Sequence, residues 1–407
     1  MAKQKYTALI DCDNFFVSCE QTRDETLRNV PVCIVSGNRG CVIARSKEAK
    51  ALGITMGMPL FMAKKQFPGC RYVNADHRLY TKISKQVMTL LKEFSPTVQI
   101  YSIDEAFIDL TGLRTAYEMN YYKIAQKIRA EILEKTGISV SIGISITKTL
   151  AKLASDRAKN TESHIILCGR SKIQKYLKTT DIDEVWGIGR NISKKLKTYC
   201  IKTAAEFLAL DDEKINKILG KNGLFVKYEL SGQMLSPVKN EKPLPKSISD
   251  TKSFEEFTSD LTKLKNELQI HIHNSCTRLR RINAECEVIG LILKTKDFQT
   301  YYLKEKLKIP TNFEFDVSKR AFELLERLYN PEILYRSIGI SLEKFTYGNQ
   351  IQPDIFGTKE KQLKREKLGK ALDKLENKFG KNIVKPGFTT ETSFKQGFLT
   401  SPNYDEV

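Results

Sequence analysis

The sequence predicts an α+β protein of several domains, the first of which follows the ferredoxin-like order β–α–β–β–α–β. Its 407 residues exceed what one hydrophobic core usually organises, so more than one domain is expected. Strand-like and helix-like apolar patterns alternate in that order between residues 6 and 168, once an insertion at 25–74 is set aside. Beyond residue 168 the pattern changes twice, first to short helices and then to a mixed α/β region.

The first domain opens with an apolar strand over residues 6–12, which runs directly into Asp11 and Asp13. A helix follows from Phe15. Apolar residues recur on one face of the segment 76–94, as expected of a long amphipathic helix. The later elements of this domain are a hairpin at 98–110, a helix at 115–135, a strand at 138–144, a helix at 147–159 and a strand at 164–168.

The insertion at 25–74 contains two short apolar strands and a helix over 46–53 that ends in glycine. Three cations lie at the start of this helix: Arg45, Lys47 and Lys50. Free N–H groups, the helix dipole and these side chains together could hold a triphosphate. The alternative is an ordinary solvated helix surface.

An abrupt acidic pair, Asp104-Glu105, interrupts the apolar hairpin at 98–110. Both side chains can reach one point only if the backbone is irregular there, because neighbouring residues of a regular strand face opposite ways. Asp11 ends the first strand, where an unpaired buried charge would be costly. If the two strands are neighbours, Asp11, Asp104 and Glu105 meet. An acidic hairpin tip facing water is the alternative.

Three carboxylates with few soft ligands nearby suit hard cations such as Mg²⁺. Two such ions about 4 Å apart can hold the attacking and leaving oxygens of a phosphoryl transfer. The residues therefore predict a two-metal nucleotidyl transferase. The helix at 147–159 adds Lys148, Lys152 and Lys159, one of which could neutralise a phosphate, although a solvated basic face explains this spacing equally.

Composition indicates a polyanionic partner. Lys and Arg number 67 against 48 Asp and Glu, which gives a net charge of +19 that is not confined to one tail. The nine cysteines form no C-x-x-C pair, which favours reduced thiols in the cytosol. Neither a signal segment before Asp11 nor an apolar run of membrane-spanning length is visible. We expect a cytoplasmic protein that contacts no membrane.

Residues 168–233 contain a Gly187-x-Gly189 turn before a helix that carries Lys194 and Lys195. Such a turn exposes backbone N–H groups that bind a DNA phosphate without regard to base sequence, as in helix-hairpin-helix motifs. A plain helical turn is the alternative.

A Gly/Pro/Lys-rich linker at 234–245 precedes an α/β domain at 246–347. Two helices, at 259–282 and 317–329, are expected against strands at 285–295, 299–303 and 335–343. Its basic residues suggest a second contact with nucleic acid; they are Arg278, Arg280, Lys294, Lys296 and Arg336. In the tail, 348–407, the peptide Gln352-Pro-Asp-Ile-Phe356 precedes a charged, helix-like stretch at 359–379.

Five motifs together resemble the Y-family translesion DNA polymerases, most closely their bacterial UmuC-type branch. The resemblance covers residues 6–347, with an extension to 356. The motifs are Leu9-Ile-Asp-Cys-Asp-Asn-Phe-Phe16, Gly40-Cys-Val-Ile-Ala-Arg-Ser-Lys-Glu-Ala-Lys-Ala-Leu-Gly53, Tyr101-Ser-Ile-Asp-Glu-Ala-Phe107, Thr147-Lys-Thr-Leu-Ala-Lys-Leu-Ala154 and Val185-Trp-Gly-Ile-Gly-Arg190.

The resemblance implies a right-hand polymerase. Its parts would be a palm (1–24 and 75–167), small fingers (25–74), a helical thumb (168–233) and a little finger (246–347). It implies low-fidelity, DNA-directed DNA synthesis across lesions, in SOS-type damage tolerance and mutagenesis.

The family's metal ligands fall on Asp11, Asp104, Glu105 and the carbonyl of Cys12, for two Mg²⁺ ions that Mn²⁺ could replace. Its steric gate, an aromatic ring that blocks a ribose hydroxyl, falls on Phe16, with Phe15 beside it. Lys50 and Lys159 take triphosphate positions.

Two positions depart from the family pattern. Lys47 stands where many relatives have tyrosine. The peptide with Gln352, Ile355 and Phe356 resembles a sliding-clamp motif, but proline takes its second position. The implied partners are primer–template DNA, a dNTP, a sliding clamp and, as in some relatives, UmuD-like or RecA proteins. We expect a monomer.

Two other functions would use the same features. A two-metal nuclease with a helix-hairpin-helix module would employ the same carboxylates, but it would cut DNA without dNTPs. A non-catalytic polymerase-like scaffold would share the positive charge, but it would be expected to have lost the carboxylates.

Overall fold

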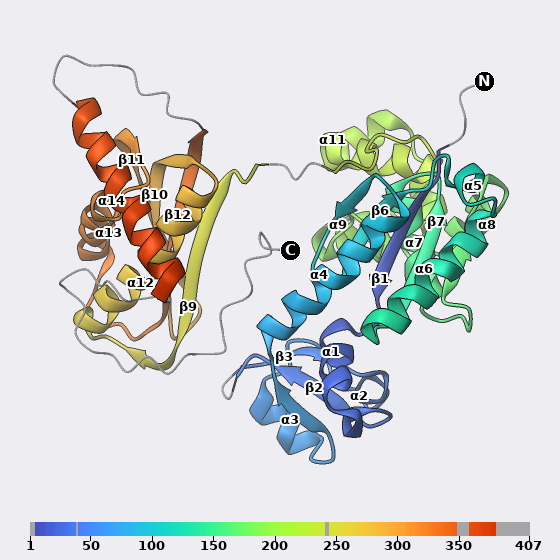
Figure 1. Ribbon diagram of the computed structural model, residues 1–407, viewed down its shortest axis with the longest axis horizontal. Helices are drawn as coiled ribbons and strands as arrows, with labels where there is room; N and C mark the ends of the chain where they lie inside the picture. Colours follow the sequence, from blue (N-terminus) through green and yellow to red (C-terminus); the bar gives the residue numbers. More distant parts are fainter. Residues whose placement is uncertain (1–4, 38–39, 241–243, 348–357, 380–407) are drawn as a thin grey trace. The chain divides into compact units, whose positions relative to one another are not determined.

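The computed structural model describes residues 5–37, 40–240, 244–347 and 358–379. Its contacts divide the chain into two compact units between Lys242 and Pro243, inside the segment expected as a linker. Figure 1 traces both units by residue number. Each is described below by itself.

The first unit is built on a five-stranded sheet with the strand order β5-β6-β1-β7-β8. The strand β1 (Thr7–Cys12) lies in the middle and pairs antiparallel with both neighbours. The other strands are β5 (Val98–Ile100), β6 (Glu105–Asp109), β7 (Val140–Ser145) and β8 (Ile165–Leu167). Without β8 this is the antiparallel sheet of a ferredoxin-like domain, as the sequence predicted.

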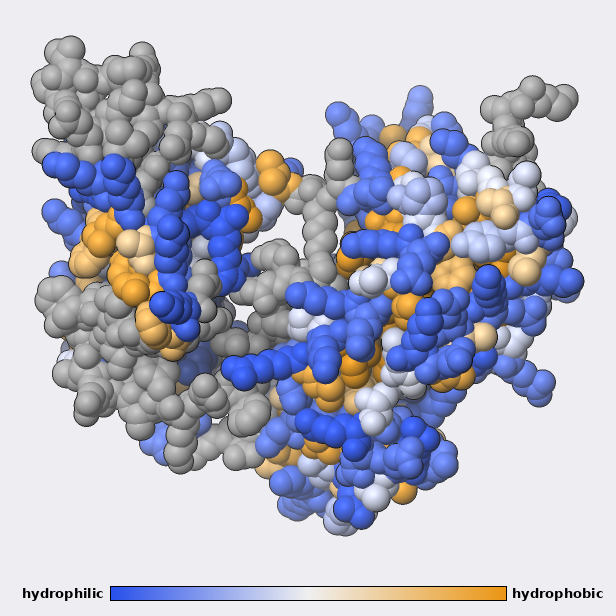
Figure 2. Space-filling view, viewed as in Figure 1, coloured by the Kyte–Doolittle hydropathy of each residue, from blue (hydrophilic) through white to orange (hydrophobic). Residues whose placement is uncertain are grey.

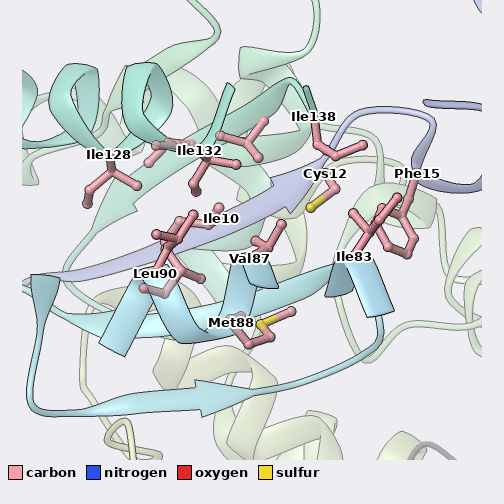
Figure 3. Close-up of a cluster of buried hydrophobic side chains, with 14 of the residues drawn as sticks. Ile10, Cys12, Phe15, Ile83, Val87, Met88, Leu90, Ile128, Ile132 and Ile138 are labelled. Atoms are coloured by element: carbon pink, nitrogen blue, oxygen red, sulfur yellow. The ribbon is translucent and has the colours of Figure 1, made fainter. Parts of the chain in front are cut away.

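Alternation along β1 assigns its two faces. Ala8, Ile10 and Cys12 pack into the large core beneath α4 (His77–Phe94) and α6 (Tyr121–Thr136), part of which is drawn in Figure 3. Leu9 faces the other way and packs against Ala151 of α7 (Lys148–Ala158). The sheet is therefore covered on both sides, and Asp11 lies on the α7 side.

Close packing fixes α7 on the sheet. A Cβ atom added at Gly143 of β7 would lie 2.1 Å from the amide nitrogen of Ser155 and 2.2 Å from the carbonyl oxygen of Ala151, both in the backbone of α7. Only glycine permits this approach. The side chains of α7 are thus held at a fixed height above the strands.

The insertion forms a second, three-stranded sheet with the order β3-β2-β4. Its strands are β2 (Val32–Val35), β3 (Val42–Arg45) and β4 (Arg71–Asn74), and its helices are α2 (Lys47–Ala51) and α3 (Leu60–Gln66). It has its own small core around Cys33, Val42 and Ile54. Two short helices lead into it from β1, α1 (Phe15–Arg23) and η1 (Glu25–Leu27). A short helix, α5 (Leu113–Ala116), precedes α6.

The helical region after β8 packs around Leu177, Leu196 and Phe207. Its elements are α8 (Arg170–Lys178), η2 (Ile182–Glu184), α9 (Arg190–Thr198), α10 (Ala204–Leu208) and α11 (Asp212–Ser231), which is kinked at Gly220. The following residues are not a free linker. The side chain of Asn240 accepts a hydrogen bond from the Val98 amide and donates one to the Pro96 carbonyl, both 2.8 Å long, at the edge strand β5.

The second unit is a four-stranded antiparallel sheet with the order β11-β10-β12-β9. Its strands are β9 (Ser247–Thr258), β10 (Ala284–Thr295), β11 (Thr300–Thr311) and β12 (Tyr335–Tyr347). The helices α12 (Leu261–Arg281) and α13 (Glu314–Leu328) bury one face of it.

Two strands of this unit differ from the sequence prediction. The strand β9 was not expected, and β11 was expected to end at residue 303, eight residues short of Thr311. A final helix, α14 (Thr358–Phe379), packs on α12 through an ion pair of Asp373 with Arg280 and on α13 through an ion pair of Arg365 with Asp316. Within the described residues, no helix has the length and apolarity needed to cross a membrane.

Candidate active site

The strand register places Asp11 directly opposite Glu105. The two are Cα partners in the antiparallel pairing of β1 with β6, so their side chains leave the sheet on the same face. Asp104 lies in the turn just before β6, where the amides of Tyr101 and Ser102 both donate to the carbonyl of Glu105. The irregular backbone expected from the sequence is this turn. The Cys12 amide, in addition, donates to the Asp104 carbonyl at 2.9 Å.

Lys152 of α7 and Lys159, which caps the C-terminal end of α7, pair with these carboxylates. Lys159 Nζ lies 2.7 Å from Asp11 Oδ2, and Lys152 Nζ lies 2.8 Å from Glu105 Oε1. The lysines are seven positions apart, which places them about two turns apart on one helix face. The sequence indicated that the two lysines lie about two turns apart on one helix, but it predicted no carboxylate partner for either of them.

The carboxylate of Asp11 is only 5% exposed. Burial raises its pKa to about 7; Lys159 opposes that shift, while Glu105 and Asp104 add to it. Although burial disfavours a charged lysine, the carboxylates of Asp11 and Asp156 raise the pKa of Lys159. The site is thus rich in negative charge that Lys152 and Lys159 only partly offset.

These residues fit a divalent cation. Glu105 Oε2 is buried and has no hydrogen-bond partner within the described part of the chain. A cation between Asp11 and Glu105 would give that oxygen a partner and would favour the ionised form of Asp11. In the arrangement described, no three His, Cys, Asp or Glu side chains of the described residues come close enough together to hold an ion. Binding by three carboxylates therefore requires these side chains to draw closer together than they lie here.

Asp13, just after the end of β1, is held by a cluster of neighbouring polar side chains. Its carboxylate accepts hydrogen bonds from Ser139 Oγ at 2.8 Å and from Ser141 Oγ at 2.6 Å, and His164 Nδ1 lies 3.3 Å away. The sequence placed Asp13 beside Asp11 but predicted no partners for it. Because Asp13 directly follows β1, these hydrogen bonds fix the end of the strand from which Asp11 projects.

The two aromatic residues of α1 have different surroundings. The ring of Phe16 is half-buried and stacks on Tyr80, with centroids 4.4 Å apart, and its edge contacts His77. Phe15 is 4% exposed and packs in the core near Ile83 (Figure 3). We therefore assign Phe15 to the core rather than to nucleotide binding, because successive helical residues point about 100° apart.

The cations near α2 are only partly available. The guanidinium of Arg45 donates to the carbonyl of Ile54, which ties it to the small sheet's own core. Lys47 and Lys50 are exposed, and Ser46 caps the helix by accepting from the Ala49 amide. This hydrogen bond uses one nitrogen of the guanidinium, so the other N–H groups of Arg45 remain donors for a phosphate.

The predicted helix-hairpin-helix turn precedes α9. Gly187 has a φ of +94°, which favours glycine, and Gly189 caps the helix. Lys194 is exposed, whereas Lys195 Nζ donates to the carbonyl of Ile218 at 2.8 Å. Trp186 Nε1 donates to the hydroxyl of Tyr101 at 3.1 Å, so this turn is joined to the acidic turn before β6.

The basic residues of the second unit fall into two groups. Arg280 makes a two-point ion pair with Asp373 of α14, at 2.6 and 2.8 Å, and Arg278 donates weakly to the Ser249 carbonyl. The prediction that Arg280 contacts DNA does not fit this pairing, because its side chain is only 10% exposed. Lys294, Lys296 and Arg336 lie instead near the β10–β11 turn. Gln352, Ile355 and Phe356 lie outside the described residues.

Comparison with known proteins identifies the family of this chain. Residues 10–156 match the impB/mucB/samB family, and residues 245–355 match that family's C-terminal domain. Protein UmuC of Salmonella typhimurium is 32% identical over 98% of this chain and 97% of its own. The chain belongs to the UmuC-type branch of the Y-family DNA polymerases.

Further relatives and solved structures agree. DNA polymerase IV of Alkaliphilus oremlandii is 31% identical over 92% of the chain and 96% of its own. A Y-family polymerase chimera of Dbh and Dpo4 has a TM-score of 0.72 at 26% identity, over 84% of this chain and 100% of the chimera. A ternary insertion complex of Dbh DNA polymerase has a TM-score of 0.59 at 25% identity, with the same coverage. This UmuC-type chain is therefore a DNA-directed DNA polymerase of low fidelity that acts in translesion synthesis.

Proposed function

We propose that this polymerase extends a DNA primer by two-metal nucleotidyl transfer, with Asp11, Asp104, Glu105 and the Cys12 carbonyl holding two Mg²⁺ ions. The observation that carries the proposal is the pairing of Asp11 with Glu105 across β1 and β6. When bound, the ions would activate the primer hydroxyl and stabilise charge on the phosphates. Mn²⁺, which also accepts oxygen ligands, is a possible substitute.

The chain's own residues have separate tasks in this scheme. Lys159 leaves Asp11 and meets the triphosphate, because the incoming phosphates offer it another anion beside the same carboxylates. Lys152 orients Glu105 through its hydrogen bond until the ligand is needed. The ring of Phe16, held against Tyr80, occupies the space that a ribose 2′-hydroxyl would require. Lys47 and Lys50, both exposed, are further phosphate contacts.

DNA would be held mainly through its backbone. The turn at Gly187 and Gly189 presents amides at the start of α9, with Lys194 beside it. In the second unit, the sheet face away from α12 and α13 carries exposed Thr251 and Lys304. Figure 2 shows hydrophilic side chains over much of the visible surface, and the net charge of +19 suits a polyanionic partner. Contacts of this kind inspect base-pair shape weakly, which is consistent with tolerance of lesions.

Partners follow from the same reasoning. Primer–template DNA and a dNTP are the proposed substrates, and related solved structures include ternary complexes of Dbh DNA polymerase. Gln352, Ile355 and Phe356 would bind a sliding clamp, and a UmuD-like protein is a further expected partner because the relative is named UmuC. All nine cysteines, which lie within the described residues, are free thiols, in keeping with a cytoplasmic location.

The test is the substitution Asp104→Asn. It should abolish primer extension with Mg²⁺ while primer–template binding persists, because the loss falls on the chemical step. Asp109→Asn at the end of β6 is the matched control, since either side chain can accept the hydrogen bond that Asp109 receives from the Thr111 amide. Retained extension by the Asp104 variant would refute the ligand assignment. Cutting of DNA by the wild type without dNTPs would favour the nuclease instead.

A further inference from the structure

An exposed aromatic residue forms the tip of the β10–β11 turn in the second unit. Phe298 is 61% exposed and has a φ of +66°. Bulky residues rarely adopt this strained, left-handed conformation, which is usual for glycine in turns. The Phe298 amide donates to the Thr295 carbonyl at 3.1 Å, so the turn is closed and holds the ring outward. Core packing does not account for the ring's position.

Two cations lie against this ring. The guanidinium carbon of Arg336 is 4.3 Å from the centroid of Phe298, and Lys294 Nζ is 5.1 Å from it. Arg336 also lies 5.8 Å from the centroid of Phe257, which is 40% exposed at the end of β9. We name Phe257, Lys294, Phe298 and Arg336 the Phe298 platform. Three of its members come from three different strands, and Phe298 comes from the turn between two.

The charges of the platform are not balanced by neighbours. Within the described part of the chain, neither Lys294 nor Arg336 makes an ion pair. Lys296 in the same turn is exposed and adds a third cation, whereas Asp297 supplies one opposing carboxylate. Cations held by rings rather than by carboxylates keep their N–H donors available for an anion.

We propose that the Phe298 platform binds an unpaired base of single-stranded DNA, with the base stacked on Phe298 and the flanking phosphates held by Lys294 and Arg336. An exposed ring beside unpaired cations suits this ligand, because every nucleobase offers a flat apolar face between phosphates. Paired bases inside a duplex do not expose that face. The inference rests on the proposed function, since it assigns a site for the unpaired template to a DNA polymerase.

The experiment compares two fluorescent DNAs with the full-length protein by anisotropy. One is a blunt duplex, and the other is the same duplex with a single-stranded template extension. The wild type should bind the extended DNA more tightly. Phe298→Ala should weaken binding of the extended DNA by about 5- to 100-fold, the range that stacking of one base supplies, and leave the blunt duplex unchanged. Phe298→Trp should retain wild-type binding.

Two further variants separate the ring from the backbone. Phe298→Gly removes the ring and relieves the left-handed φ, so it should fold at least as stably as the wild type and still lose the same binding. Phe315→Ala is the matched control, because Phe315 is 52% exposed on α13, beyond the opposite end of β11, and should change nothing.

The outcomes distinguish this inference from the proposed function. A wild type that neither extends primers nor binds primer–template DNA would refute the proposed function itself. A wild type that extends primers but binds both DNAs equally would overturn only the platform. The same holds if Phe298→Ala or Phe298→Gly binds the extended DNA like the wild type, or if each weakens both DNAs by the same factor.

Discussion

Gly143 offers the sharpest test of how the fold positions the active site. Its replacement by alanine places a Cβ atom 2.1 Å from the Ser155 amide nitrogen and 2.2 Å from the Ala151 carbonyl oxygen. Both atoms belong to the backbone of α7, so no side-chain rotation relieves the clash. Because ordinary contacts between such atoms begin near 3.4 Å, α7 must retreat by roughly 1 Å.

This retreat has two consequences. Overpacking of this kind costs about 1–3 kcal/mol of the free energy of unfolding, which a lowered Tm should reveal. Lys152 and Lys159 move with α7 away from Glu105 and Asp11, and a displacement of about 1 Å among catalytic groups can reduce the rate roughly 100-fold.

The assays are thermal unfolding and steady-state primer extension with one dNTP. Gly143→Ala should lower kcat/KM by more than its loss of stability explains, because most of the protein remains folded at 25 °C. Gly69→Ala is the control, because its added Cβ meets nothing within 4 Å and its φ is not in the left-handed region. Wild-type Tm and kcat/KM in Gly143→Ala would refute the claim that backbone contact sets the height of α7.

Three other predictions address separate residues. Phe16→Ala should admit ribonucleotides in primer extension, and unchanged discrimination between sugars would remove its gate role. Replacement of Ile355 and Phe356 by alanine should weaken binding to a sliding clamp in a pull-down; equal binding by both proteins would count against the peptide. His273→Ala should lower the Tm of the second unit at pH 6, by the loss of roughly 1–3 kcal/mol, and much less at pH 9. Burial disfavours the charged imidazole, but the carboxylates of Glu314 and Glu376 outweigh this effect and raise the pKa of His273. The stabilisation by charged His273 is therefore complete below the unfolded-state pKa near 6.5, and it is lost as the pH rises through the higher folded-state pKa. A pH-independent difference in Tm would contradict this ion-pair role.

The elements that the sequence located well are those whose apolar residues repeat at a regular spacing. The helix α4 and the strands around β1 bury one face or both, so their side chains repeat at 3.6 or 2 residues. The strand β9 was missed because only Ile248 and Thr258 of its twelve residues are buried, as befits an edge strand. Residues 304–308 of β11 alternate with lysine on an exposed face, which resembles a loop in composition.

Within the active site, the meeting of Asp11 with Glu105 could be predicted because acidic residues end or interrupt apolar strands. The partner of Lys152 could not, since it depends on the distance between α7 and the sheet that Gly143 sets. Arg280 looked like a DNA contact because it lies in a basic run. Its partner, Asp373, is 93 residues away, and nothing in the local sequence indicates the pair.

The lysines that face Asp11 and Glu105 act as built-in counterions for an acidic sheet end. Clustered carboxylates repel one another at short range. The ammonium groups 2.7 and 2.8 Å away offset this repulsion within the fold itself. The order of this sheet end therefore depends on the lysines of the overlying helix as well as on the pairing of its strands.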